Sequence, residues 1–161
     1  MKVSGRLPGR DRQLQTIMRL HRISSTFYRW RLPVAGRLVE GIIRVLFGAV
    51  VPGRATIARS AFFEHSGLGV VLNELSVIGE NCRIGVHVVL GGKAPIIGAP
   101  TLEDGVIVHA GAKLIGPITV GEGTVIAANA VVIGDLPPRS MAAGVPAVVK
   151  KGLTGQADEN V

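Results

Sequence analysis

The chain has 161 residues, enough for one domain and a small appendage. Hydrophobic residues make up 47% of it and aromatic residues only 4%, so its core must be aliphatic. With one cysteine, Cys82, the chain cannot form an internal disulfide. The net charge is +7, but residues 1–50 hold ten basic and two acidic side chains, whereas residues 51–161 hold eight and nine. The near-neutral larger part argues against nucleic acid as its partner.

Two helices are predicted in the basic first part of the chain. Residues 1–10 are expected to be disordered and residues 11–48 to form a helical segment. The first helix begins near Asp11, and its apolar stripe comprises Leu14, Ile17, Met18, Ile23, Phe27 and Trp30. The second follows Pro33 and is apolar around most of its circumference, with its charges on one narrow stripe at Arg37, Glu40 and Arg44.

The second helix is too short and too charged to span a membrane, because a span needs about 20 mostly apolar residues. We expect it to pack within an oligomer. The alternative is contact with the inner face of a membrane through residues 11–50, where basic side chains would meet anionic lipid. No secretory leader is recognisable, so the expected location is cytoplasmic.

Between Leu72 and Asp135 an apolar residue recurs at every sixth position. The positions are Leu72, Ile78, Ile84, Leu90, Ile96, Leu102, Val108, Leu114, Val120, Ile126 and Val132. A period of six fits neither an amphipathic helix nor a simple strand, and short repeats are typical of a solenoid. The predicted fold class is mainly β, a parallel β-helix of hexapeptide repeats over residues 54–151, followed by a flexible tail at 152–161.

Each hexad is expected to supply one short strand and one corner, with the lattice residue pointing into the core. A glycine often follows directly, as at Gly79 and Gly85, and lets the backbone turn where a Cβ atom would crowd it.

Two places depart from the regular repeat. The step from Phe63 to Leu72 is nine residues, so three extra residues lie in this corner. Between Leu90 and Leu102 the hexads stay in phase, but their glycines and prolines predict a loop that leaves the coil wall. Departures from a repeat are where function tends to be placed.

Three histidines, His65, His87 and His109, are spaced 22 residues apart on the solenoid. Even spacing suggests zinc at subunit junctions, but their different hexad phases predict different directions, and no cysteine or closely spaced histidine supports ligation. We therefore expect no metal. His65 is the best catalytic candidate, because it precedes the lattice interruption and an imidazole can take a proton from a hydroxyl. The alternative is a solvated corner histidine.

Several stretches resemble the serine acetyltransferase family of hexapeptide acyltransferases, particularly short members such as the colanic-acid-type exopolysaccharide O-acetyltransferases. The matching stretches are His21-Arg22-Ile23, His65-Ser66-Gly67, Val70-Val71-Leu72-Asn73, Ser76-Val77-Ile78-Gly79, Val89-Leu90-Gly91-Gly92, Leu102-Glu103-Asp104-Gly105-Val106 and Ala142-Ala143-Gly144-Val145-Pro146-Ala147. The resemblance implies a left-handed β-helix, a homotrimer or dimer of trimers, and acetyl-CoA as co-substrate in a groove between neighbouring subunits.

The resemblance also implies roles for individual residues. His65 matches the family's catalytic histidine, the general base for an acceptor hydroxyl that attacks the thioester directly. Acceptor binding is expected at Glu64, Asn73, Gly98 and Ala99. Binding of acetyl-CoA is expected at Gly91, Gly92, Ala110, Gly111, Ala112, Lys113 and Lys150.

Two departures from the family pattern shape the prediction. Val50 replaces the carboxylate fifteen residues before the catalytic histidine, so a backbone carbonyl, Glu74 or a residue of a neighbouring subunit would have to orient His65. Gly98-Ala99 replaces the Arg-His pair that binds the substrate serine. The predicted acceptor is therefore a hydroxyl of a sugar or polysaccharide precursor, as in exopolysaccharide biosynthesis. Serine is the first alternative, and a non-catalytic β-helix scaffold is the second.

Overall fold

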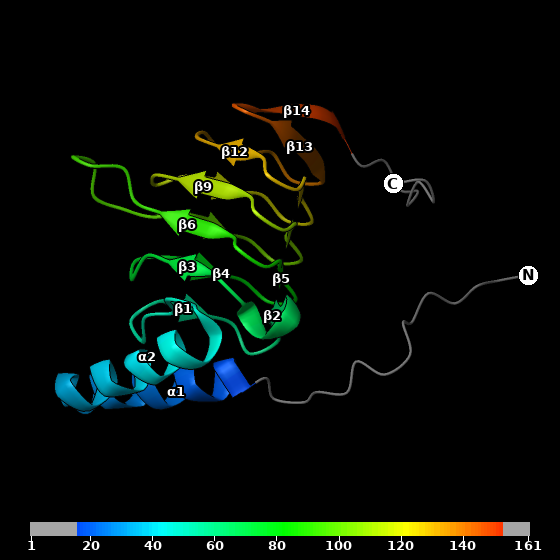
Figure 1. Ribbon diagram of the computed structural model, residues 1–161. Helices are drawn as coiled ribbons and strands as arrows, with labels where there is room; N and C mark the ends of the chain where they lie inside the picture. The colour runs from blue at the N-terminus through cyan, green and yellow to red at the C-terminus, as the bar shows by residue number, and fades with distance from the viewer. Residues whose placement is uncertain (1–15, 153–161) are drawn as a thin grey trace, which may run out of the picture.

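A computed structural model describes residues 16–152 (Figure 1). Two helices, α1 (Thr16–Arg29) and α2 (Pro33–Phe47), pack side by side across one end of a parallel β-helix. The segments predicted to be disordered at the start and flexible at the end lie outside the described residues, apart from Gly152, as does the helix start predicted near Asp11. No helix among residues 16–152 is long and apolar enough to cross a bilayer.

The inner face of α1 differs from the predicted stripe. Its buried residues are Ile17, Met18, His21 and Ser24. Ile23 and Trp30, which were predicted to continue the stripe, are 46% and 67% exposed. The reason is a close approach of backbones, since a Cβ atom at Gly53 would lie 2.3 Å from the Ser24 hydroxyl. A large apolar side chain cannot fit between α1 and the coil there, so small and polar residues occupy the contact.

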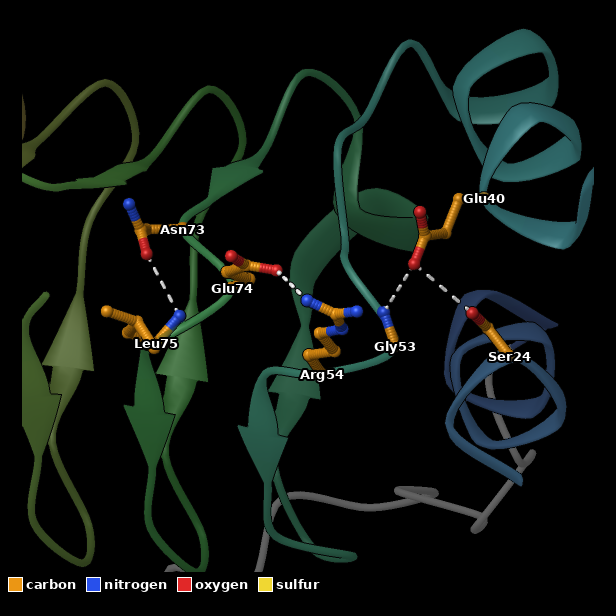
Figure 2. A network of polar contacts seen from close by, with 7 residues as sticks. All are labelled: Ser24, Glu40, Gly53, Arg54, Asn73, Glu74 and Leu75. Carbon is orange, nitrogen blue, oxygen red and sulfur yellow. Dashed lines mark hydrogen bonds and ion pairs between the residues drawn. The ribbon is translucent and has the colours of Figure 1, made fainter. Parts of the chain in front are cut away.

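Helix α2 begins at Pro33 and ends before Gly48, whose φ of 58° is left-handed and whose N–H donates to the Arg44 carbonyl. Its buried residues are Gly36, Val39 and Ile43. Its three charged residues were predicted to lie on one narrow stripe, but only Arg37 and Arg44 are exposed. Glu40 turns inward, where it accepts hydrogen bonds from the Gly53 N–H at 2.8 Å and the Ser24 hydroxyl at 3.3 Å (Figure 2). The exposed face is therefore apolar and carries Val34, Leu38, Ile42, Val45 and Leu46.

Three sheets form the walls of the β-helix, and up to β13 strands that follow one another in sequence lie in different sheets (Figure 1). The first wall consists of β1 (Thr56–Ile57), β4 (Val77–Ile78), β7 (Thr101–Leu102) and β10 (Thr119–Val120). The second consists of β2 (Phe62–Phe63), β5 (Arg83–Ile84), β8 (Ile107–Val108), β11 (Val125–Ile126), β13 (Ser140–Gly144) and β14 (Ala147–Gly152). The third consists of β3 (Val71–Leu72), β6 (Val89–Gly91), β9 (Lys113–Ile115) and β12 (Val131–Val132). Only the last pair, β13 and β14, is antiparallel.

The lattice residues form the core of the solenoid, as predicted. Ten of the eleven have at most 2% of their surface exposed: Leu72, Ile78, Ile84, Leu90, Leu102, Val108, Leu114, Val120, Ile126 and Val132. Cys82 is also buried, and its thiol donates to the Glu103 carbonyl at 3.0 Å. Because no single coil could bury these side chains, the stack of coils is the unit of stability.

The exception is Ile96, which was predicted to be buried and is 53% exposed. Strand β10 pairs with β7 at an offset of 18 residues, which is three hexads, but β8 pairs with β5 at an offset of 24. One whole hexad is therefore looped out after β6, and the loop extends beyond the neighbouring corners (Figure 1). Because the inserted loop adds six residues, the lattice has the same phase before and after it. Periodicity alone therefore cannot show that this hexad leaves the coil.

The glycines that follow lattice residues lie where a Cβ atom would be crowded, as predicted, but their backbone conformation does not itself require glycine. Gly79, Gly85 and Gly121 have no left-handed φ angle. Instead, each lies against the backbone of the next coil: a Cβ atom at Gly85 would be 2.6 Å from the Ala110 nitrogen. Glycine is needed here for the close approach of coils, and the tight stacking fixes the positions of the corners on which the site residues lie.

Candidate active site

The corner between β2 and β3 contains His65 in a strained conformation. A short 3-10 helix, η1 (Glu64–Gly67), replaces the regular corner. Three consecutive residues are left-handed, with φ angles of 48° at His65, 60° at Ser66 and 74° at Gly67. For two non-glycine residues this costs roughly 1–2 kcal/mol each. Single left-handed residues also occur in other corners, as at Asn81 and Asn129, but this corner has three in succession, which makes it a candidate site.

The imidazole of His65 is exposed and accessible to a ligand. No other residue within 16–152 makes a hydrogen bond or ion pair with it. Glu64, the adjacent carboxylate, is engaged elsewhere: Arg83 Nη2 donates to it at 2.6 Å, with both side chains about one-third exposed. This ion pair ties the His65 corner to β5 in the next coil.

Two of the three predicted orienting groups do not act on His65 within the chain. Glu74 forms an ion pair with Arg54 at 3.2 Å (Figure 2), and no described backbone carbonyl accepts a bond from the imidazole. Val50, at the position of the family's carboxylate, pairs through its backbone with Val71 beside β3. A residue of a neighbouring subunit is the candidate that remains.

His87 lies in the same corner as His65, one coil further along the solenoid. Its N–H donates to the Leu68 carbonyl at 2.9 Å, and its own φ is 56°. Its ring folds back over the previous coil, where a Cβ atom at Gly69 would lie 2.0 Å from the His87 Nδ1 atom. Because the first corner holds three extra residues, His87 lies over Gly69 of the previous coil. That the His65 and His87 side chains point in different directions stays a prediction.

His109 begins the corresponding corner of the third coil, between β8 and β9. The three histidines thus occupy one column of corners, yet no group of three potential metal ligands lies close enough to hold an ion within residues 16–152.

Part of the predicted acetyl-CoA site lies in this same column. Gly111, with a φ of 74°, donates its N–H to the Val86 carbonyl, and its own carbonyl accepts a bond from Lys113 Nζ at 2.9 Å. Ala110 is exposed beside it. Ala112 was predicted to contact acetyl-CoA, but its side chain is buried in the core. Its N–H donates to the His109 carbonyl, and its carbonyl accepts the Val89 N–H, so neither group is free for a ligand.

The predicted acceptor residues Asn73, Gly98 and Ala99, together with Gly91 and Gly92, lie at the opposite edge of the third wall, where β3 and β6 end. Asn73 uses its side-chain oxygen to accept the Leu75 N–H at 2.9 Å (Figure 2). A Cβ atom at Gly92 would be 3.2 Å from Asn73 Nδ2 and 3.3 Å from the Gly98 carbonyl, so these three residues adjoin. Gly91 accepts the Gly116 N–H through its carbonyl.

The Gly98-Ala99 pair has a packing role in the loop. Gly98 has a φ of 140°, and a Cβ atom there would lie 2.6 Å from the Pro117 Cβ. Ala99 is only 8% exposed. In this loop conformation an arginine at position 98 would collide with Pro117, so the wall offers no place for the family's carboxylate-binding side chain.

The candidate residues therefore form two groups on the two edges of one wall. His65, Ala110, Gly111 and Lys113 lie where its strands begin, whereas Asn73, Gly91, Gly92, Gly98 and Ala99 lie where they end. Strands of two or three residues, at about 3.3 Å per residue, separate them. Lys150 is exposed on β14, at the far end of the second wall. A single chain does not bring all of these residues together.

Comparison with known proteins identifies related chains. Residues 99–134 match the model of the bacterial transferase hexapeptide family (six repeats). The serine acetyltransferase of Bacillus pumilus is 38% identical over 144 residues, covering 87% of this chain and 66% of its own length. The structure of soybean serine acetyltransferase with serine is 34% identical with a TM-score of 0.79, covering 83% of this chain and 56% of that chain.

A solved serine acetyltransferase in complex with CoA is 31% identical with a TM-score of 0.78, covering 83% of this chain and 55% of that one. The chain thus spans about half to two thirds of the length of these proteins. The similarity extends across both helices and the solenoid, because it includes more than four fifths of the chain. By its repeats, its left-handed parallel β-helix and these relatives, the chain belongs to the hexapeptide-repeat acyltransferases, among proteins similar to serine acetyltransferases.

Proposed function

We propose that the protein is an acetyl-CoA-dependent O-acetyltransferase with His65 as general base. The acceptor oxygen attacks the carbonyl carbon of the thioester while the imidazole takes the hydroxyl proton. The carbon–sulfur bond then breaks, and the CoA thiolate leaves and receives a proton. The observation that carries the proposal is the exposed imidazole, held in a strained left-handed corner with no partner among the described residues. The CoA complex of a related enzyme supports the choice of donor.

We propose a sugar hydroxyl as the acceptor, and serine as the second candidate. The names of the relatives favour serine. The geometry favours a sugar, because Gly98 packs against Pro117 and leaves no place for an arginine to bind a free carboxylate. Sugars present hydroxyls without that charge.

An acceptor comparison tests this ranking. We expect thiol release from acetyl-CoA to saturate with a saccharide acceptor, and catalytic efficiency with L-serine to be at least about tenfold lower, since one missing charged hydrogen bond is worth roughly 1.5–3 kcal/mol. The assay measures release of the CoA thiol with a panel of saccharides and with L-serine, each over the same range of concentrations. Higher efficiency with L-serine would reverse the ranking. Failure of acetyl-CoA to bind in calorimetry would instead favour a non-catalytic scaffold.

The two separated groups of candidate residues support a homotrimer, in which one subunit's His65 corner faces a neighbour's loop. The loop presents Ile97 to solvent, 89% exposed, and burial against another copy would remove this apolar surface from water. The same contact would supply the group that orients His65. Sedimentation equilibrium measures the mass of the assembly and so distinguishes a trimer from a dimer of trimers.

We also propose that α2 contacts an anionic membrane surface from the cytoplasmic side. Its five exposed aliphatic residues form one face, Arg37 and Arg44 are exposed beside it, and Glu40 is turned inward, so the face carries no acid. We expect the protein to sediment with phosphatidylglycerol vesicles and Leu38→Glu to abolish this. Loss of self-association in Leu38→Glu, without any vesicle binding by the parent, would identify the face as a contact between copies.

A further inference from the structure

A cleft of about 440 Å³ lies between α1 and the first coil of the β-helix. Four arginines line it, Arg22 and Arg29 from α1 and Arg54 and Arg59 from the coil. The hydroxyls of Ser25 and Thr26 also line it, and none of its described lining residues is acidic. The volume lies within the range of small-molecule sites, roughly 300–1,000 Å³.

Two of the four arginines have local explanations. Arg54 forms an ion pair with Glu74 at 3.2 Å, and its guanidinium carbon lies 5.0 Å from the centre of the Tyr28 ring. Arg29 lies in the last turn of α1, where the helix dipole favours a cation, and it donates to the Thr26 hydroxyl at 3.3 Å.

Arg22 and Arg59 have no such explanation. Neither forms an ion pair with another residue in the described part of the chain. Arg22 Nη2 lies 3.5 Å from the Arg59 backbone carbonyl, a weak hydrogen bond that places the Arg22 guanidinium beside residue 59, and both residues line the cleft. Convergent positive charge in a concave site raises the local concentration of anions.

The floor of the cleft is rigid and neutral. His21 is only 4% exposed, and its Nε2–H donates to the Ala55 carbonyl at 3.2 Å, which fixes α1 on the coil. Burial lowers the pKa of His21, although the Ala55 and Pro52 carbonyls oppose the shift. The ring therefore adds no charge near neutral pH, and the positive charge of the cleft comes from the guanidinium groups. A guanidinium group can donate two parallel hydrogen bonds to two oxygens of one phosphate, a match that a spherical anion such as chloride does not offer.

The cleft is separate from the His65 corner. A Cβ atom at Gly67 would lie 2.8 Å from Ile17 Cδ1, so the first turn of α1 adjoins that corner. Arg22 lies about 7.5 Å beyond Ile17 along the helix, and Arg29 about 18 Å, at 1.5 Å per residue. No residue of the Glu64–Gly67 corner lines the cleft, so we expect a ligand there not to contact the imidazole of His65.

We propose that this cleft binds the phosphate group of a phosphate or diphosphate ester, with Arg22 and Arg59 as its main ligands. A dianion or trianion balances the guanidinium charges that no described carboxylate neutralises. The phosphate can belong to a soluble ester or to a lipid headgroup, since both present the same oxygens.

Titration calorimetry with inorganic pyrophosphate tests the proposal on the full chain. We expect saturable binding of one equivalent per chain, weakened about tenfold by Arg22→Gln and by Arg59→Gln, because a charge-assisted hydrogen bond is lost in each. Arg139→Gln removes the same charge from an exposed corner at the other end of the solenoid and is the matched control. His65→Ala should leave this binding unchanged, which separates it from the proposed catalysis.

Vesicles distinguish the two sources of phosphate. If the ligand is a lipid, phosphatidic acid vesicles bind the parent chain, Arg22→Gln weakens the binding, and millimolar pyrophosphate competes. If it is soluble, pyrophosphate binds and the arginine variants bind vesicles as the parent does. The proposal is wrong if neither probe binds, or if Arg139→Gln weakens binding as much as Arg22→Gln does. Circular dichroism of each variant shows that it remains folded.

Discussion

Replacing His65 by Ala is expected to reduce the rate of acetyl transfer by about 10²–10⁴-fold while acetyl-CoA binding remains. The range is the usual contribution of a positioned general base, and the expected separation of rate from binding follows from the role of the imidazole in proton transfer alone. The imidazole makes no hydrogen bond or ion pair with another described residue, so its removal is expected to leave the Glu64–Arg83 ion pair and the neighbouring coils in place. Initial rates of thiol release at saturating substrates measure the loss, and calorimetry with CoA measures binding.

His87 supplies the sharpest control for this experiment. It is exposed, it lies in the same corner of the next coil, and its loss removes an equal imidazole. We expect His87→Ala to retain the rate within about tenfold, because the hydrogen bond to the Leu68 carbonyl comes from the backbone N–H of residue 87, which the variant keeps. A large loss in His87→Ala with none in His65→Ala would transfer the role of base to His87.

Replacing Ile84 by Ala is expected to lower the free energy of unfolding by about 2–5 kcal/mol. Ile84 has no exposed surface and lies in the middle coils, where neighbouring coils cannot collapse into the cavity without losing their register. Ile96 is the matched control, since it is the same residue on the same six-residue lattice but is 53% exposed. We expect Ile96→Ala to change the free energy of unfolding by at most about 0.5 kcal/mol.

Urea denaturation followed by circular dichroism, at one protein concentration, measures both changes. Equal destabilisation by the two variants would show that Ile96 is buried in solution, by the coil or by another subunit. Comparing several protein concentrations separates these explanations, because burial between subunits makes stability depend on concentration.

The fold could be predicted from the sequence because its main determinant is periodic. Ten lattice residues are buried as their spacing predicts, from Leu72 to Val132. Periodicity fails where an insertion equals one repeat, as at Ile96, since the phase on either side is unchanged.

The site was less predictable than the fold, because it depends on neighbours distant in sequence. No spacing rule indicates that Glu64 pairs with Arg83, that Glu40 turns toward Gly53, or that Gly98 lies against Pro117. These contacts follow from stacking one coil on the next and from packing α1 and α2 on the first. The assignment of His65 as base remains a prediction for which the strained corner is the structural support.

The most direct test of direct acetyl transfer is the stoichiometry of the reaction. Thiol release from acetyl-CoA and formation of the acetyl ester on a saccharide are measured together, by absorbance and by mass spectrometry, for the parent chain and for His65→Ala. We predict one ester per thiol released, no acetyl group on the protein, and loss of both products in the variant. Thiol release without an ester, acetyl bound to the chain, or equal rates for the two proteins would contradict the account.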